Sequence, residues 1–310
     1  MSKLLFGDLV SVVIPAYNHA SFIRAALDSV YVQTYPNIEL ILLDDCSKDR
    51  TLEIAKEWAE EKKANERFVR VIIEANQVNL GAHNTINKGL ALAQGNALTV
   101  LNSDDLYAPT RLEILLQQAE KHQADWLFTG IRVVDEKGAR MYSELAIGIE
   151  TSIDYAANFP SVGFALLKKN IAVTTGNLFF SRELYDKVGP FKKLKYCHDW
   201  DFALQACLFS APLLVEEPLY QYRIHGANSF AALQVEQYLE SQIVYKNYFS
   251  KCQTSMCINL NAPSSLNWPM FFDKWIAADS VLSWVFYLVG AEVVRYDRMT
   301  QLMNQAKDVS

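Results

Sequence analysis

The sequence lacks the glycine patterns that mark several classes of nucleotide-binding enzyme. The segment after the first strand-like run reads Pro-Ala-Tyr-Asn-His-Ala from residue 15 and holds no glycine. A dehydrogenase would carry Gly-x-Gly-x-x-Gly there, and a nucleotidyltransferase would carry a glycine-rich loop with an arginine. The P-loop pattern Gly-x-x-x-x-Gly-Lys-Ser/Thr is absent from all 310 residues. The sequence therefore argues against these three classes of enzyme.

Positive charge and long hydrophobic runs are also scarce. The formal net charge is −6 and the pI is about 5.5, which argues against a nucleic acid as the main partner. The longest apolar run, Val281–Ala291, is interrupted by Ser283 and is shorter than the roughly 20 residues that span a membrane. We expect a buried helix there, although an aromatic-rich helical tail could also lie on a lipid surface.

Cysteine is infrequent and irregularly spaced. The five cysteines include Cys252 and Cys257, but no second pair completes a zinc site. We expect reduced, mostly buried thiols, which suit the cytoplasm. Residues 1–7 hold one lysine and a very short apolar stretch, a pattern that does not resemble a signal peptide. The expected location is the cytoplasm, with the inner face of the membrane as an alternative.

The first hundred residues alternate between strand and helix patterns, which is typical of βαβ units and a parallel sheet. Hydrophobicity predicts four strands, at Leu9–Ile14, Ile38–Leu43, Phe68–Ile73 and Ala97–Leu101. Helical periodicity predicts three helices, at Ser21–Gln33, Thr51–Lys63 and Ala82–Ala93. Such a sheet places the carboxyl ends of its strands along one edge, where ligands bind.

The rest of the chain is less regular. The patterns predict helices at Pro109–Gln123 and Asp199–Phe209, and strands at Asp125–Val134, Asn177–Ser181, Leu213–Val215 and Tyr220–Ile224. Residues 147–167 show no clean period, and the pattern is helical from Ala231 onward. These patterns divide the chain into residues 1–106, residues 107–229 of the same domain and a C-terminal helical extension (230–310).

Polar clusters follow the predicted strands. Pro15 ends the first strand, and Tyr17 could stack on a base or a sugar. After the second strand, Asp45 could accept a hydrogen bond from a ligand N–H. Each cluster has a plain alternative, which is a turn with a half-buried tyrosine for the first and an acidic helix-capping turn for the second.

A carboxylate pair follows the fourth strand, in Asn102-Ser103-Asp104-Asp105. Hard divalent cations bind carboxylate and carbonyl oxygens. This segment could therefore hold Mg²⁺ or Mn²⁺ against a diphosphate. A solvated turn is the alternative.

Two later clusters could take part in the same site. Asp199 opens a helix beside aromatic residues, where partial desolvation would raise its pKa and suit a general base. It could instead be only a helix cap. Arg223 and His225 lie on a short strand and could reach phosphate oxygens or the metal, although a lone histidine is more often structural.

In their order along the chain, these clusters resemble family 2 of the inverting glycosyltransferases, over about residues 10–229. The resemblance implies a GT-A fold, in which a mostly parallel α/β sheet is flanked by helices, followed here by the C-terminal helical extension. It implies Mn²⁺ or Mg²⁺ as cofactor and Asp199 as the catalytic base. Its implied metal ligands are Asp104, Asp105 and His225. Its implied nucleotide-binding residues are Pro15, Tyr17, Asn18, Asp45, Gly81 and Ser103. The acceptor and diphosphate side is implied to include Gly176, His198, Trp200 and Arg223.

The sequence departs from the family pattern at Asn102, which stands where the first acid of the Asp-x-Asp motif is usual. Asp104 must then be the main metal ligand. The helix after Asp199 lacks the Gln-x-x-Arg-Trp motif of processive members, which favours transfer of a single sugar. A catalytically degenerate member that binds a partner is the alternative.

Only the family resemblance implies a nucleotide-sugar-binding role for residues 1–106 and an acceptor-binding role for residues 107–229. The resemblance also implies the partners. We expect a nucleotide-diphosphate sugar as donor, with uridine or thymidine as base, and a glycan or lipid-linked acceptor, in cell-surface polysaccharide biosynthesis. No nucleic acid is expected. Three roles are open for the C-terminal helices: packing on the catalytic domain, forming a homodimer, or contacting a membrane peripherally.

Overall fold

The first hundred residues alternate between strands and helices, as the sequence predicts. The computed structural model describes residues 6–226, 234–269, 271–272 and 274. The first part of the chain contains β1 (Val10–Ala16), α1 (Ile23–Tyr31), β2 (Ile38–Asp44), α2 (Thr51–Glu61), α3 (Ala64–Arg67), β3 (Arg70–Ala75), α4 (Ala82–Leu92) and β4 (Ala97–Val100). Only the short helix α3 is new relative to the predicted pattern.

The second part mixes short helices and strands with longer elements. In order, it contains β5 (Leu106–Tyr107), α5 (Arg111–His122), β6 (Trp126–Val134), α6 (Glu144–Glu150), η1 (Thr151–Asn158), α7 (Val162–Lys168), η2 (Thr175–Asn177), β7 (Phe179–Ser181), α8 (Arg182–Val188), α9 (His198–Cys207), β8 (Leu213–Arg223) and α11 (Gln234–Cys252). The sequence did not predict β5. The predicted helix at Val281–Ala291 lies outside the described residues.

All eight strands form one sheet in the order β3-β2-β1-β4-β7-β6-β8-β5. The four strands β3, β2, β1 and β4 are parallel, and so are β6 and β8. Antiparallel pairing joins β7 to β4 and to β6, and β5 to β8. The expected mostly parallel α/β sheet of GT-A type is therefore confirmed.

Two predicted strands are in fact one. Residues 213–215 and 220–224 were expected to be separate because the polar segment 216–218 interrupts the hydrophobic pattern. The structure continues β8 through this segment with a shift of register beside Gly130 of β6. A Cβ on Gly130 would lie 2.4 Å from the carbonyl oxygen of Glu216, so the close approach of the two backbones requires glycine there.

Pro15 does not end the first strand, contrary to the sequence-based expectation. It pairs with Leu43 of β2 inside the register of β1. Its ring nitrogen faces the β4 side, as Val13 does, and β4 pairs with β1 only as far as Val100. The missing N–H therefore costs no ladder hydrogen bond, which explains why proline is tolerated in this strand.

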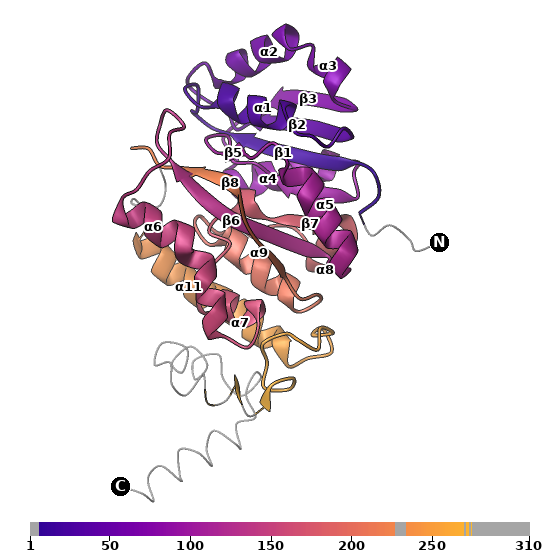
Figure 1. The fold of residues 1–310 in the computed structure, drawn as a ribbon, viewed down its shortest axis with the longest axis vertical. Coiled ribbons are helices and arrows are strands. Elements are labelled where there is room, and N and C mark those ends of the chain that lie inside the picture. The colour runs from indigo at the N-terminus through magenta and orange to yellow at the C-terminus, as the bar shows by residue number, and fades with distance from the viewer. Residues whose placement is uncertain (1–5, 227–233, 270, 273, 275–310) are drawn as a thin grey trace, which may run out of the picture.

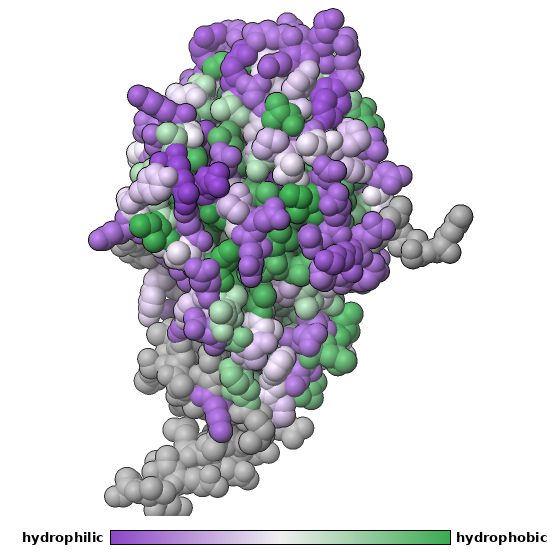
Figure 2. All heavy atoms as spheres, viewed as in Figure 1, coloured by the Kyte–Doolittle hydropathy of each residue, from purple (hydrophilic) through white to green (hydrophobic). Residues whose placement is uncertain are grey.

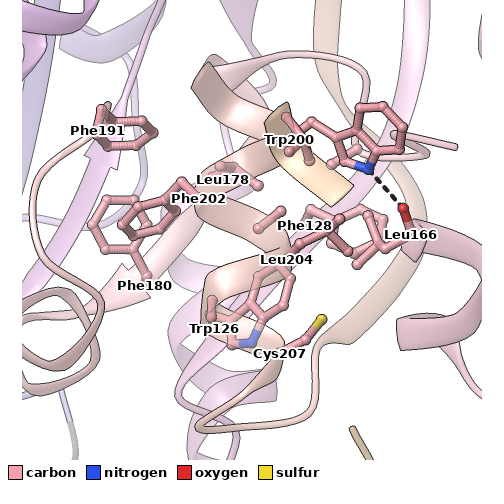
Figure 3. Packing of buried hydrophobic residues seen from close by; sticks show 14 of the residues in the cluster. Trp126, Phe128, Leu166, Leu178, Phe180, Phe191, Trp200, Phe202, Leu204 and Cys207 are labelled. Carbon is pink, nitrogen blue, oxygen red and sulfur yellow. Dashed lines mark hydrogen bonds between the residues drawn. The ribbon is translucent and has the colours of Figure 1, made fainter. Parts of the chain in front are cut away.

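Helices cover both faces of the sheet (Figure 1). Alternate strand residues supply two cores. Val12 and Leu40 face the core shared with α1, α2, α5 and α6, whereas Val13 and Ile41 face the core shared with α4, α7, α9 and α11. Figure 3 shows the aromatic centre of the second core. The sheet is thus the middle of three layers.

The described part of the C-terminal extension packs on the catalytic domain. Val244 and Tyr248 of α11 are buried in the same core as α9, and Figure 1 shows α11 beside α7, away from α2 and α3. In Figure 2 the end of the molecule that carries α2 and α3 is largely hydrophilic, whereas hydrophobic side chains gather lower down. Among the described residues, none of the helices is long and apolar enough to cross a membrane.

Candidate active site

Three neighbouring parallel strands, β2, β1 and β4, end at the same edge of the sheet. The polar segments that follow them are therefore brought together there. The end of β8 reaches the same place, because the backbone N–H of Arg223 donates to Oδ1 of Asp105 at 2.7 Å. Most of the predicted site residues meet at this edge.

The loop 17–20 is held in place by the segment that follows β2. The N–H of Asn18 donates to Oγ of Ser47 at 2.9 Å, and the N–H of His19 donates to Oγ1 of Thr51 at 2.8 Å. Asn18 has a φ of 55°, a left-handed conformation that asparagine tolerates better than most residues. These contacts fix where the His19 ring lies.

The centre of the site is a carboxylate between two imidazoles. Oδ2 of Asp104 lies 3.0 Å from Nε2 of His225 and 3.8 Å from Nε2 of His19. The other ring nitrogen of His19, Nδ1, is 2.7 Å from Oγ of Ser103. One ligand atom from each of His19, Asp104 and His225 lies within 4.8 Å of the others, a group that could hold a metal ion. The predicted ligands Asp104 and His225 are thus brought together.

The protonation of this group suits a cation. Burial lowers the pKa of His19, although the charge of Asp104 partly opposes this effect, so the ring is mainly neutral at pH 7. Burial alone would raise the pKa of Asp104, but the hydrogen bond with His225 and the nearness of His19 hold it below its ordinary value. Neutral imidazole and ionised carboxylate are the forms that bind metals.

Asp105 lies deeper than Asp104 and is 1% exposed. Its Oδ2 accepts hydrogen bonds from the Tyr220 hydroxyl at 2.6 Å and from Nδ2 of Asn102 at 3.0 Å, while Oδ1 accepts from the N–H of Arg223. Burial and the neighbouring Asp104 raise its pKa well above the ordinary value. Asp105 is not in the metal-competent group among the described residues. Its metal role stays a prediction, and its contacts tie β8 to the 102–105 turn.

The Arg223 guanidinium is also occupied by protein contacts. Its Nε donates to the Asp104 carbonyl at 2.7 Å, and Nη1 donates to the carbonyls of Asp135 and Glu136 at 2.9 and 2.8 Å. The residue is 2% exposed. Arg223 therefore braces the turn that carries Asp104, and its predicted place on the diphosphate side stays a prediction.

On the nucleotide side, Asp45 fixes the turn before α4. Its Oδ1 accepts from Nδ2 of Asn76 at 2.9 Å and from the N–H of Leu80 at 2.8 Å, while Oδ2 accepts from the N–H of Gly81 at 2.8 Å. Gly81 has a φ of 81°, which favours glycine. Each carboxylate oxygen can accept two hydrogen bonds, so Oδ2 keeps one acceptor position. Tyr17 is 43% exposed and leaves its ring open to stacking.

Asp199 lies at the start of α9, as predicted. Its Oδ1 accepts from the N–H of Trp200 at 2.7 Å, and its Oδ2 accepts from Nδ2 of Asn170 at 3.1 Å. Burial raises its pKa to about 7, against the lowering effect of these two hydrogen bonds. A carboxylate with that pKa can accept a proton near neutral pH.

The segment 170–177 connects the two halves of the site. Besides the bond from Asn170 to Asp199, Thr174 accepts from Nδ2 of Asn102 at 2.6 Å. Thr175 Oγ1 is 3.1 Å from Nε2 of His198. One short segment therefore contacts both the turn beside Asp104 and the residue before the base.

Tyr222 of β8 is influenced by both carboxylates. Its pKa is raised by burial first, and then by the charges of Asp105, Asp104, Tyr196 and Asp199. The charges of the predicted metal ligand and of the predicted base therefore act on the same side chain.

The remaining predicted residues are His198, Trp200 and Gly176. Burial lowers the pKa of His198 to about 4, so this ring is neutral. The indole N–H of Trp200 donates to the Leu166 carbonyl at 2.6 Å inside the core (Figure 3). A Cβ on Gly176 would lie 2.0 Å from the Tyr220 hydroxyl, so only glycine fits. Trp200 and Gly176 are thus held by packing, and their predicted contact with substrate is untested.

A family model described as "Glycosyl transferase family 2" matches residues 11–189, more than half of the chain. The chain belongs to glycosyl transferase family 2. The matched residues contain the motif-bearing segments as far as the segment 170–177. Membership of this family makes the protein a glycosyltransferase.

Relatives of this family 2 glycosyltransferase include an uncharacterized glycosyltransferase of Rickettsia typhi, 30% identical over 244 residues, or 77% of this chain and 71% of that protein. A PGL/p-HBAD biosynthesis glycosyltransferase of Mycobacterium bovis is 26% identical over 282 residues, or 90% of this chain and 98% of that protein.

Two solved structures are similar in fold. S. aureus TarS 1–349 in complex with UDP-GlcNAc has a TM-score of 0.61 and 21% identity, covering 81% of this chain and 69% of that one. The mannosyltransferase PcManGT from Pyrobaculum calidifontis, in complex with GDP-Man and Mn²⁺, has a TM-score of 0.61 and 16% identity, covering 97% and 79%.

The sequence analysis did not single out two residues that the structure brings to the candidate site. His19 directly follows Pro-Ala-Tyr-Asn, and histidine is the commonest protein ligand of metals, so its position after a strand was a usable signal. Asn170 has no comparable signal, because it lies in an irregular segment 29 residues before Asp199. Only the tertiary structure brings it to the base.

Proposed function

We propose that the chain catalyses metal-dependent, inverting transfer of one sugar from a UDP- or dTDP-sugar to a hydroxyl of a glycan or lipid-linked acceptor. The observation that carries the proposal is the segment 170–177. It contacts the turn that carries Asp104, which is flanked by two histidines, and it also contacts Asp199, whose pKa is about 7. The names of the relatives support it, since one acts in PGL/p-HBAD biosynthesis and one fold neighbour binds UDP-GlcNAc.

The residues present fit a divalent cation. His19, Asp104 and His225 offer two ring nitrogens and one carboxylate oxygen within 4.8 Å of one another. Ser103 holds Nδ1 of His19, which leaves Nε2 toward Asp104, and such partners orient the ligands of metal sites. The bound ion, Mn²⁺ or Mg²⁺, would neutralise negative charge on the diphosphate. The bound Mn²⁺ of PcManGT supports this assignment.

Donor binding is assigned to the loops at the ends of β1 and β2. Tyr17, beside Pro15 and Asn18, would stack on the base, and Asp45 would accept the base N–H while it holds Gly81. Ser103 belongs to this side through its contact with His19. With the donor bound in this way, the group of His19, Asp104 and His225 would face the diphosphate.

Asp199 would act as general base. Its carboxylate removes the proton from the acceptor hydroxyl while that oxygen attacks the anomeric carbon on the side opposite the diphosphate, so configuration inverts. Asn170 orients the carboxylate by donating to Oδ2. His198, Trp200, Gly176 and Arg223 are assigned to the acceptor and diphosphate side, where the last three act mainly by holding the backbone.

The first test is a thermal-shift panel of UDP-, dTDP-, GDP- and CMP-sugars, each with and without Mn²⁺. A donor at a hundredfold excess over its Kd should stabilise the fold by roughly 2.7 kcal/mol, and the shift should need Mn²⁺. No shift with any sugar would favour the alternative, a degenerate family member that binds a partner.

Turnover then separates enzyme from binding protein. Asp199→Asn should lower kcat by about 10² or more while donor affinity survives. Calorimetry with UDP should show that Asp104→Ala, His19→Ala and His225→Ala each weaken Mn²⁺ binding. The control is His122→Ala, because His122 is an exposed residue in the last turn of α5. Equal Mn²⁺ affinities would refute the metal assignment.

We place the protein in the cytoplasm, at the inner face of the membrane when the acceptor is lipid-linked, in cell-surface polysaccharide biosynthesis. Contact with the membrane and a homodimer through the C-terminal helices remain predictions of the sequence. Fractionation and light scattering test them.

A further inference from the structure

The helix α11 of the C-terminal extension runs alongside α9, the helix that carries Asp199. Nδ2 of Asn247 donates to Oδ1 of Asp201 at 2.7 Å, and Nζ of Lys251 donates to Oε1 of Gln205 at 2.7 Å. Residue numbers increase together in the two pairs, so the helices run in the same direction. The N-terminal end of α9 therefore lies beside the part of α11 around residues 240–244.

At that end, a single carboxylate of α11 holds the chain that leads into α9. Oε1 of Glu240 accepts the backbone N–H of Lys195 at 2.5 Å. Its Oε2 accepts the N–H groups of Tyr196 and Cys197 at 2.8 and 2.9 Å. Three successive backbone donors converge on one side chain that lies more than 40 residues further along the chain. Hydrogen bonds from N–H groups to an ionised carboxylate are among the stronger ones in proteins.

We propose that Glu240 is a positioning residue for the base Asp199, so that the C-terminal helix α11 forms part of the catalytic unit. The inference rests on the proposed function, because it assumes that Asp199 takes the proton of the acceptor. It assigns a role in catalysis to the C-terminal extension, which lies beyond residues 11–189 that the family model matches.

The physical argument starts from the position of Asp199, the second residue of α9. Cys197 is the residue that caps this helix and it offers no side-chain cap hydrogen bond. The backbone N–H groups of residues 195–197 therefore depend on the Glu240 carboxylate for the hydrogen bonds given above. A shift of about 1 Å in a catalytic group can lower the rate roughly 10²-fold. Loss of the three hydrogen bonds should therefore displace Asp199 and lower the rate.

The charge of Glu240 adds a second effect. After burial, which dominates, Glu240 is among the causes that raise the pKa of Asp199. The other charged or titratable groups around Asp199 come from its own helix, from the preceding segment and from β8: His198, Asp201, Lys192, Tyr196, Cys197 and Tyr222. The helix α11 contributes Glu240 beside the segment 195–197 and Tyr245 beside Trp200, and only Glu240 is changed in the test. Its neutralisation should thus lower the pKa of the base.

The first arm of the test needs no substrate. Glu240→Gln leaves one acceptor oxygen and turns an amide nitrogen toward an N–H donor. Hydrogen exchange measured by mass spectrometry should become at least tenfold faster in the peptide that covers residues 195–197. Lys251→Ala is the matched control, because it removes a contact between the same helices further from the base. Unchanged exchange in Glu240→Gln would overturn the structural link.

The second arm measures kcat/KM for the acceptor against pH, at saturating donor and Mn²⁺. Glu240→Gln should lower the rate about tenfold or more and move the acidic limb roughly half a pH unit lower. Lys251→Ala should leave the limb in place. Faster exchange with an unmoved limb and an unchanged rate would refute the positioning role. A wild-type protein without transfer activity would instead refute the proposed function, and the exchange arm would still decide the structural link.

Discussion

The buried carboxyl of Asp199 should lower the free energy of unfolding at neutral pH. Its pKa is about 7 against an ordinary value of 3.8, mainly because of burial. The folded carboxyl thus holds its proton to a higher pH than the unfolded one does. The free energy of unfolding therefore falls as the pH rises from about 4 to about 7, and stays reduced above that. We expect Asp199→Asn to remove this loss and to stabilise the protein, while it lowers kcat by about 10² or more.

The size of the gain follows from the two pKa values. A difference of about 3 units corresponds to roughly 4 kcal/mol above pH 7. The amide should keep the local hydrogen bonds, because its oxygen can still accept the N–H of Trp200. Its nitrogen can donate to Oδ1 of Asn170, a buried atom without a hydrogen-bond partner among the described residues, once that amide flips. Little of the gain should be lost to unpaired groups.

The assay is urea unfolding of the wild type and Asp199→Asn at pH 5 and pH 8.5. The gain in unfolding free energy should be about two and a half times as large at pH 8.5 as at pH 5. Asp154→Asn is the control, because this carboxylate is exposed and its replacement should give no such gain. A lower stability of Asp199→Asn at both pH values would refute the reasoning from burial.

Three further predictions concern the site and its support. Gly176→Ala should lower the free energy of unfolding by about 3 kcal/mol, because its Cβ would lie 2.0 Å from the Tyr220 hydroxyl. Gly148→Ala in α6, where nothing lies within 4 Å, should raise it by up to about 1 kcal/mol, and equal melting temperatures would contradict both. Asp45→Asn should cost about 2 kcal/mol in urea unfolding, because an amide cannot accept all three hydrogen bonds of the turn; an unchanged unfolding curve would argue against this role. The acidic limb of kcat/KM should fall near pH 7, since only ionised Asp199 accepts a proton, and a flat profile from pH 5 to 8 would count against the base.

Much of the parallel half of the fold could be read from local patterns. The predicted strands at residues 38–43 and 97–101 differ from β2 and β4 by one residue at an end. Buried parallel strands are continuous hydrophobic runs, and helices repeat at 3.6 residues, so both signals are contained in short windows. Asp104 and Asp199 could be placed for the same reason, because each follows or begins such an element.

The second half was harder because its elements depend on distant partners. β8 looks like two strands until Gly130 of β6 is seen to admit its polar segment. Pro15 looks like a strand end until the neighbouring strand β4 is seen to stop first. In both cases the deciding group lies far away in the sequence.

For the site, the sequence determined which side chains are available at the strand ends and in what order. Only the tertiary structure decided which of them lie together. It placed His19 rather than Asp105 beside Asp104 and His225. It buried Asp199 against Asn170, and brought Glu240 to the start of α9. Distances of a few ångströms and the exclusion of water set the charge and reach of each group, and both depend on how segments remote in the chain pack together.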